Sequence, residues 1–302
     1  MDISSIKKTM RIGMMGPFYP VPDGVAGNDR IEYMIKKSHE LGCKVLQLSF
    51  ELPEDDEEKL KYFAALGKEL DVEFEVRMPF DIWQLTENYE SAKKSFEARI
   101  KTMKILGCKI MRGGYGKLKI ESSRFNKDIS IPDHLKKLED NLKLAAKIVE
   151  ENDVYLAIEN HCDFKGVELA TVFKAVGSKN VGCAMDTANG FTVFCDPNDD
   201  VEALAPYTIT THVKDMVIKQ ETAPGDLIPF FASGCALGDG HVNIPRALDL
   251  FAEKAPYPEN LHIIIETGWH DQAPDASKEE KEAFSFDVFH RSIAFLKKHL
   301  YE

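Results

Sequence analysis

The sequence lacks the features by which membrane, secreted and disulfide-rich proteins are recognised. No window approaches the roughly 18 uninterrupted apolar residues of a transmembrane helix, and the polar start, from Met1 to Lys8, contains no apolar core of signal-peptide length. The six cysteines are scattered without a CxxC pair, which favours reduced thiols over a disulfide framework. We therefore expect a cytoplasmic protein with no membrane partner.

Positive charge is also scarce: 38 Lys and Arg face 50 Asp and Glu, a formal net charge of −12. Because binding to phosphates rewards clustered Lys and Arg, nucleic acid is not an expected partner. The stretch Gly113-Gly114-Tyr115-Gly116 has neither the GxGxxG nor the Walker spacing. Cys162 and Cys183 lack an evident base and orienting partner for nucleophilic catalysis. No lysine occupies the centre of an apolar strand, which argues against a Schiff-base aldolase.

What is present is a regular alternation of short apolar runs and amphipathic segments. The runs are almost continuously apolar, as parallel strands covered on both faces are. No linker or low-complexity tract divides the chain. The alternation predicts an α/β fold, a (β/α)8 TIM barrel that forms a single domain over residues 1–302. The strands are expected at 11–16, 45–50, 73–78, 109–112, 155–159, 181–186, 209–213 and 262–266, and the helices at 30–41, 57–70, 91–106, 131–149, 167–176, 199–204, 244–254 and 281–299.

Three connections are longer than plain turns: 17–28, 113–129 and 214–243. Each follows the C-terminal end of a predicted strand, which is the catalytic face of a TIM barrel. Loops of this length are usually functional or disordered. We therefore expect them to enclose a substrate. The first helix is expected to be capped by Asp29.

Four predicted strands end in residues that bind metal ions well: Glu159, Asp186, His212 and Glu266. In a parallel barrel these ends converge on one face. Three carboxylates and one imidazole make a hard site suited to Mn²⁺ or Mg²⁺ and able to take Co²⁺ or Zn²⁺. One such residue would more often cap a helix, but four at corresponding positions predict a site for one divalent cation.

The motifs around these strand ends resemble the xylose isomerase-like barrels of the sugar isomerase/epimerase group, including the tagatose and psicose 3-epimerases. The resemblance implies one divalent ion, most often Mn²⁺, bound by the four residues, with Glu159 and Glu266 also serving as acid and base on opposite faces of the substrate. It implies an isomerase or epimerase of a small carbohydrate and subunit pairing through barrel-rim loops. The matching segments are Ile158-Glu159-Asn160-His161, Met185-Asp186-Thr187, His212-Val213-Lys214-Asp215, Gly238-Asp239-Gly240-His241-Val242-Asn243 and Ile265-Glu266-Thr267.

The ion would polarise a sugar carbonyl and stabilise the enediolate that forms when a base removes the neighbouring proton. One departure stands out: the 3-epimerases carry a histidine three residues beyond the aspartate of the sixth strand, where this chain has Asn189. His161, two residues after Glu159, is either a general base or a capping or solvent-facing histidine. The departure leaves room for a lyase: β-elimination on a 3-oxo-glycoside, which would deglycosylate C- or O-glycosides.

Several further residues are candidates for binding the substrate. Lys214 would steady a substrate oxygen or pair with Asp215. Arg112 would bind a phosphate or carboxylate, or pair with a carboxylate of the barrel rim. His241 lies in a glycine-rich turn before a helix, where a plain turn is favoured over an anion site. Asn189 is a further candidate. Aromatic residues that would stack on a sugar, if they do not simply pack, are Phe18, Trp83 and Trp269.

Two other classes of function are less well supported. A nuclease of the endonuclease IV type shares this barrel but needs a zinc cluster and histidines on earlier strands, and the second and third strands here end at Phe50-Glu51 and Pro79-Phe80. A non-catalytic barrel that binds carbohydrate or serves as a subunit is disfavoured by the intact ligand set. An obligate partner subunit stays open.

Overall fold

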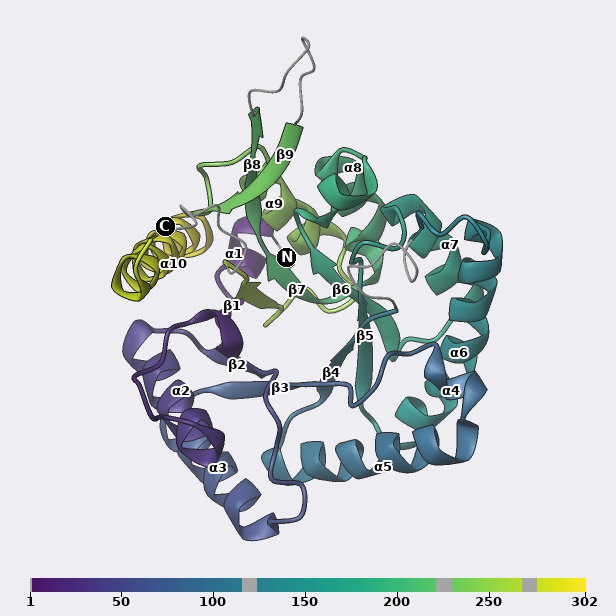
Figure 1. Cartoon of the computed structure of the whole chain (residues 1–302), viewed down its shortest axis with the longest axis horizontal. Coiled ribbons are helices and arrows are strands. Elements are labelled where there is room, and N and C mark those ends of the chain that lie inside the picture. The colour runs from purple at the N-terminus through teal and green to yellow at the C-terminus, as the bar shows by residue number, and fades with distance from the viewer. Residues whose placement is uncertain (1, 116–123, 221–229, 268–275) are drawn as a thin grey trace.

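In the computed structural model the described residues are 2–115, 124–220, 230–267 and 276–302. Eight parallel strands close into a barrel in the order β1-β10-β7-β6-β5-β4-β3-β2, with helices around it (Figure 1). The predicted (β/α)8 fold is confirmed. The barrel strands are β1 (Arg11–Met15), β2 (Val45–Leu48), β3 (Glu73–Arg77), β4 (Ile110–Gly113), β5 (Tyr155–Glu159), β6 (Val181–Asp186), β7 (Thr208–Val213) and β10 (His262–Ile265).

Each barrel strand is followed along the chain by one of the eight expected helices. These are α2 (Gly27–Leu41), α3 (Glu57–Glu69), α5 (Tyr89–Leu106), α6 (Ile131–Glu151), α7 (Gly166–Val176), α8 (Pro197–Leu204), α9 (Ile244–Lys254) and α10 (Lys278–Tyr301). Short additional elements are α1 (Ile3–Lys7), α4 (Gln84–Glu87) and the 3₁₀ turns η1 (Gly16–Phe18), η3 (Asn189–Val193) and η4 (Ala205–Tyr207).

The predicted cap of the first long helix is wrong. Helix α2 begins at Gly27, with Ala26 in the N-cap position and no side-chain cap. Asp29 lies in the first turn instead. A carboxylate in the first turn still faces the positive end of the helix dipole. An aspartate near the start of a helix therefore looks the same in the sequence whether it occupies the N-cap or the first turn.

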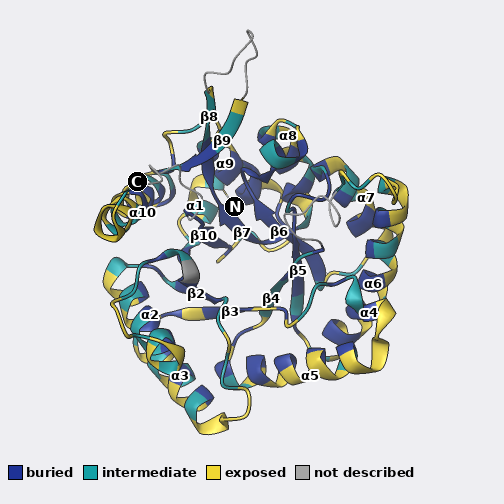
Figure 2. Ribbon diagram, viewed as in Figure 1, coloured by how far each residue is buried: buried dark blue, intermediate teal, exposed yellow. Residues whose placement is uncertain are grey.

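The core lies on both sides of the barrel wall. Every residue of β6 and β7 is buried, and the helices turn their buried sides toward the strands (Figure 2). Helix α6 shows the pattern, burying Leu138, Leu142, Ala145 and Val149 at helical spacing. Each fully buried leucine contributes roughly 1.5–3 kcal/mol relative to an exposed one. This packing gives the strand ends a rigid frame.

The long connection after β7 is not an irregular loop. It contains an antiparallel hairpin of β8 (Asp215–Gln220) and β9 (Phe230–Cys235), paired from Asp215↔Cys235 to Gln220↔Phe230. In Figure 1 the hairpin extends outward from the ring of strands. The sequence predicted a long connection here but not this hairpin. The connection 113–129 lies partly outside the described residues.

Asp215 fixes the return from this hairpin to α9. Its carboxylate accepts hydrogen bonds from the backbone N–H groups of Met216, Gly238, Gly240 and Val242, at 2.9–3.1 Å. A Cβ atom at position 240 would lie 2.1 Å from Asp215 Oδ1, so the close approach requires glycine. The amides of this glycine-rich turn thus bind the protein's own carboxylate.

Candidate metal centre

The barrel brings together the four predicted ligands. Glu159 and Asp186 are the last residues of β5 and β6, and His212 is the next-to-last residue of β7. Glu266 directly follows β10. Asp186 and His212 are register partners. One ligand atom from each of the four residues lies within 4.8 Å of the others, and all four side chains are buried.

Two atoms of this cluster lack hydrogen bonds. In the described part of the chain, His212 Nδ1 and Asp186 Oδ2 are buried and have no hydrogen-bond partner. Charged groups are nevertheless close: Glu266 Oε2 lies 2.9 Å from Nδ1, and Lys214 Nζ lies 2.7 Å from Oδ2. Leaving buried polar atoms without hydrogen bonds costs free energy. A lone pair on each, beside the oxygens of Glu159 and Glu266, fits a hard divalent cation.

Two basic side chains balance the carboxylates. Lys214 Nζ lies 2.7 Å from Asp186 Oδ2 and 3.1 Å from Glu266 Oε1. Arg112 Nη1 lies 2.9 Å from Glu159 Oε2. Among the described residues, Lys214 thus pairs with two candidate ligands, Asp186 and Glu266, and not with the adjacent Asp215. Arg112 makes the predicted contact with a carboxylate at the rim.

The charges in the cluster shift one another's pKa values. Burial opposes ionisation of Glu159, but Arg112 and His212 outweigh it and hold the pKa well below its usual range. Burial likewise opposes ionisation of Glu266, but Lys214 and His212 lower its pKa. For Asp186 burial prevails over Lys214 and raises the pKa to about 6.

The imidazole of His212 responds to the same carboxylates. Burial disfavours its protonated form, but Glu159 and Glu266 outweigh burial and raise its pKa to about 9. A cation bound at Nδ1 takes the place of a proton, because imidazole binds metal in its neutral form. The metal-free cluster is thus a set of anions around one protonated histidine and one lysine.

Two asparagines hold the strand ends, one of which the sequence did not single out. Asn189 Nδ2 donates to Glu159 Oε1 at 3.4 Å, which places this candidate at the cluster. Asn160 links β5 to β6: its Nδ2 donates to the Asp186 carbonyl at 2.9 Å and its Oδ1 accepts from the Asp186 amide at 2.7 Å. The sequence signal that could have identified Asn160 is its amide side chain directly after a predicted strand.

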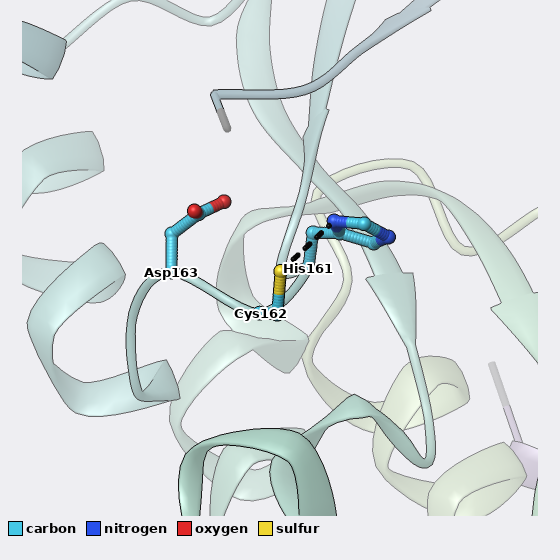
Figure 3. Close-up of side chains that lie close together, drawn as sticks. All are labelled: His161, Cys162 and Asp163. Carbon is cyan, nitrogen blue, oxygen red and sulfur yellow. Dashed lines mark hydrogen bonds between the residues drawn. The ribbon is translucent and has the colours of Figure 1, made fainter. Parts of the chain in front are cut away.

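His161 lies at the edge of the same region. Its ring is half-buried, and burial lowers its pKa, against the opposing charges of Glu159 and Glu266. Figure 3 shows the thiol of Cys162 beside this imidazole, with Sγ 3.4 Å from Nδ1. His161, Cys162 and Asp163 also bring ligand atoms within 4.8 Å of one another, but three consecutive residues are close by covalent connection. Burial raises the pKa of the Cys162 thiol to about 12, which favours the protonated thiol near neutral pH.

The remaining candidates lie elsewhere or outside the described residues. His241 is exposed, and its Nδ1 accepts from the backbone N–H of Ile218 at 3.1 Å, in keeping with a turn at the base of the hairpin. Trp83 and Phe18 pack against the core. Trp269 lies outside the described residues.

The comparisons agree with the fold. Residues 35–286 match the family described as the Xylose isomerase-like TIM barrel, and the chain belongs to that family. No curated protein matches the chain by sequence.

Several solved structures share the barrel over nearly its whole length. D-psicose 3-epimerase, solved in the presence of D-fructose, is 14% identical with a TM-score of 0.68, covering 97% of this chain and 100% of that one. The 3-keto-D-glucoside 4-epimerase of E. coli is 13% identical with a TM-score of 0.65, covering 96% and 99%. A probable 3-DHS dehydratase from Bacillus anthracis is 11% identical with a TM-score of 0.63, covering 95% and 99%. At such identities these likenesses show the fold. No helix among the described residues has the length and apolar character needed to cross a bilayer.

Proposed function

We propose that the protein is a divalent-metal-dependent isomerase or epimerase of a small carbohydrate, acting by proton abstraction next to a carbonyl. The observation that carries this proposal is the buried cluster of Glu159, Asp186, His212 and Glu266, with atoms within 4.8 Å at the C-terminal ends of four barrel strands. We expect Mn²⁺ in this site, with Mg²⁺, Co²⁺ or Zn²⁺ as other hard or borderline ions that the donor set accepts.

The positions of Glu159, Glu266 and Lys214 suit them to different roles in this reaction. Glu159 and Glu266 come from β5 and β10, which β6 and β7 separate in the barrel. They therefore approach the cluster from different sides, as an acid and a base on opposite faces of a substrate must. Lys214 reaches the same cluster with a buried ammonium group, positioned to hold a substrate oxygen that gains negative charge. A bound divalent ion would supply Lewis-acid polarisation of the carbonyl.

An elimination reaction is the second candidate. Asn189 occupies the position where the resembled 3-epimerases have histidine, and it donates to Glu159. An amide holds a substrate oxygen but does not take up a proton near neutral pH. Abstraction of the proton next to a carbonyl, followed by loss of a leaving group from the β-carbon, gives a lyase from the same first step. A dehydratase is among the solved structures with this fold.

Hydrogen–deuterium exchange tests both candidates. The Mn²⁺-loaded protein is incubated in D₂O with ketoses, sugar phosphates and 3-oxo-glycosides, and each is followed by NMR. We expect exchange at one C–H next to a carbonyl, with an epimerised product for the first candidate and a released aglycone for the second. Glu159→Gln and Glu266→Gln should abolish exchange, while the surface change Glu202→Gln should not.

Failure of every substrate to exchange with the wild-type protein, with the metal demonstrably bound, would overturn the proposal of carbon-acid chemistry. A binding or subunit role for the barrel would then be favoured.

A further inference from the structure

A line of buried polar side chains crosses the interior of the barrel to His212. It comprises Gln47 on β2, Glu75 on β3, and Thr210 and His212 on β7, and each has 0% of its surface exposed. Burying an ionisable carboxyl group is costly unless it is paired and hydrogen-bonded. Aliphatic side chains of similar volume would fill the same space at lower cost. The line therefore calls for an explanation beyond packing.

The hydrogen bonds along the line are continuous. His212 Nε2 lies 3.0 Å from Gln47 Oε1, and Gln47 Nε2 donates to Glu75 Oε2 at 2.9 Å. Glu75 Oε1 accepts from Thr210 Oγ1 at 2.5 Å and lies 2.7 Å from His262 Nδ1. The other ring nitrogen of His262 lies 3.0 Å from Glu73 Oε2. Each of these hydrogen bonds has either a named donor or a histidine ring nitrogen that can donate.

The direction of these bonds is set at Glu75. Burial opposes its ionisation, but the hydrogen bond and charge of His262 outweigh burial and lower its pKa. A carboxylate only accepts hydrogen bonds, so the amide of Gln47 must turn its NH₂ group to Glu75 and its oxygen to His212. That oxygen accepts only, so His212 must carry a proton on Nε2.

From this we infer that Gln47 and Glu75 are positioning residues that hold His212 in the Nε2–H tautomer, leaving the Nδ1 lone pair for a divalent cation. Nδ1 is the ring atom that lies 2.9 Å from Glu266 Oε2 and has no hydrogen-bond partner in the described part of the chain. Partners of this kind fix the orientation of metal-binding histidines and raise their basicity. The inference rests on the proposed metal centre and adds residues from β2 and β3, which the four ligands do not involve.

The test compares three variants by Mn²⁺ affinity and by the ¹⁵N NMR signature of the His212 tautomer in the metal-free protein, at a pH above the His212 pKa of about 9, where the ring is neutral. Gln47→Met removes the acceptor at similar volume; we expect Mn²⁺ affinity to fall about 10–100-fold and the Nε2–H form to lose its dominance. The exchanged pair Gln47→Glu/Glu75→Gln places a carboxylate beside His212 and an amide behind it, so the acceptor is kept. It should restore affinity to within a few-fold of wild type.

Asn141→Leu is the matched control. Asn141 is an equally buried amide on helix α6, and it binds Thr86 and the Lys137 carbonyl and none of the cluster residues. It should lower stability without changing Mn²⁺ affinity or the tautomer. Wild-type protein that binds no Mn²⁺ would contradict the proposed metal centre itself. Normal Mn²⁺ affinity and an unchanged tautomer in Gln47→Met would overturn the positioning role alone.

Discussion

The two carboxylate oxygens of Asp186 have different surroundings. Its Oδ1 accepts hydrogen bonds from the backbone N–H groups of Ala188 and Asn189, at 2.8 and 3.0 Å, as an aspartate does in an Asx turn. This turn leads into η3, whose own N-cap residue is Ala188. The Oδ2 atom has no hydrogen-bond partner among the described residues and lies beside Lys214. One side chain can therefore stabilise the turn through one oxygen and present the other to the proposed metal centre.

Removing the metal should lower thermal stability as well as activity. An ion that binds only the native state at 100 times its dissociation constant stabilises it by about 2.7 kcal/mol. We therefore expect the melting temperature to fall by several degrees when EDTA replaces Mn²⁺, measured by scanning calorimetry. His212→Ala should melt at the same temperature in both buffers. Equal melting temperatures for the wild-type protein under both conditions would argue against a native-state ion.

Replacing Lys214 should harm the metal-free protein more than the loaded one. Lys214 lies between Asp186 and Glu266 and is buried. Lys214→Met leaves two buried carboxylates uncompensated, at a cost of about 3–5 kcal/mol. Saturating Mn²⁺ should recover part of this loss, because the ion supplies positive charge at the same place. Urea denaturation with EDTA or with Mn²⁺ measures the difference.

The exposed pair Lys254–Glu202 provides the comparison. Lys254→Met should cost at most about 1 kcal/mol in either buffer. A Lys214→Met variant equally unstable with and without Mn²⁺ would contradict the shared location of lysine and ion.

At the scale of elements, Asp215 organises the segment between β7 and α9. The four amides that it binds belong to the hairpin and to the glycine-rich turn. Asp215→Ala leaves several buried donors unsatisfied, at about 1–3 kcal/mol for each. We expect a loss of at least about 3 kcal/mol in urea denaturation. Asp239→Ala, in the same turn but exposed and paired with Arg291, should lose less than about 1 kcal/mol. Similar losses for both would show that charge, and not the amide contacts, stabilises the turn.

The barrel strands were predictable because burial on both faces makes their sequences almost continuously apolar. The hairpin was not predictable, because its strands are only partly buried and lack a continuous apolar run. Strand β8 reads Asp-Met-Val-Ile-Lys-Gln and becomes more exposed toward its end. Its pairing with β9 depends on a partner across nine intervening residues outside the described part of the chain. Sequence patterning did not separate such a pair from an irregular loop.

At the scale of the whole molecule, the clustering of the four strand-end residues was predictable because barrel topology places equivalent positions together. Gln47 and Glu75 were not. Gln47 is 165 residues from His212 along the chain, and Glu75 is 187 residues from His262. Gln47 is the single polar residue of β2, and Glu75 lies between Glu73 and Arg77 in a strand of alternating polarity, where nothing in the sequence marks it as buried. Only closure of the barrel shows that they contact one another.

The ion pairs of His262 with Glu73 and Glu75 should make the free energy of unfolding depend on pH in the alkaline range. Burial disfavours protonated His262, but Glu73 and Glu75 on β3 raise its pKa to about 9. Arg11 on β1 adds a further positive charge nearby, because its Nη1 lies 3.4 Å from Glu73 Oε1. Because the folded-state pKa lies above the ordinary 6.5, the stabilisation is fully present below pH 6.5, declines as pH rises, and is lost above about 9. Its size is on the order of 3 kcal/mol.

The measurement is the stability difference between wild type and His262→Gln across pH 6–10. We expect a large difference at pH 6 that shrinks toward pH 10. A difference that stays constant over this range would show that His262 does not change its protonation there.

The buried hydrogen bonds that run from His262 through Glu75 and Gln47 to His212 also bear on whether such a centre can be moved to another protein. A graft that moves only the rim segments to another barrel would transfer all four ligands and leave His212 facing a foreign interior. On our inference, a faithful transplant must also carry the polar positions of β2, β3 and β7 and the histidine that begins β10. The proposed metal centre would therefore depend on residues deep inside the barrel as well as on those at its rim.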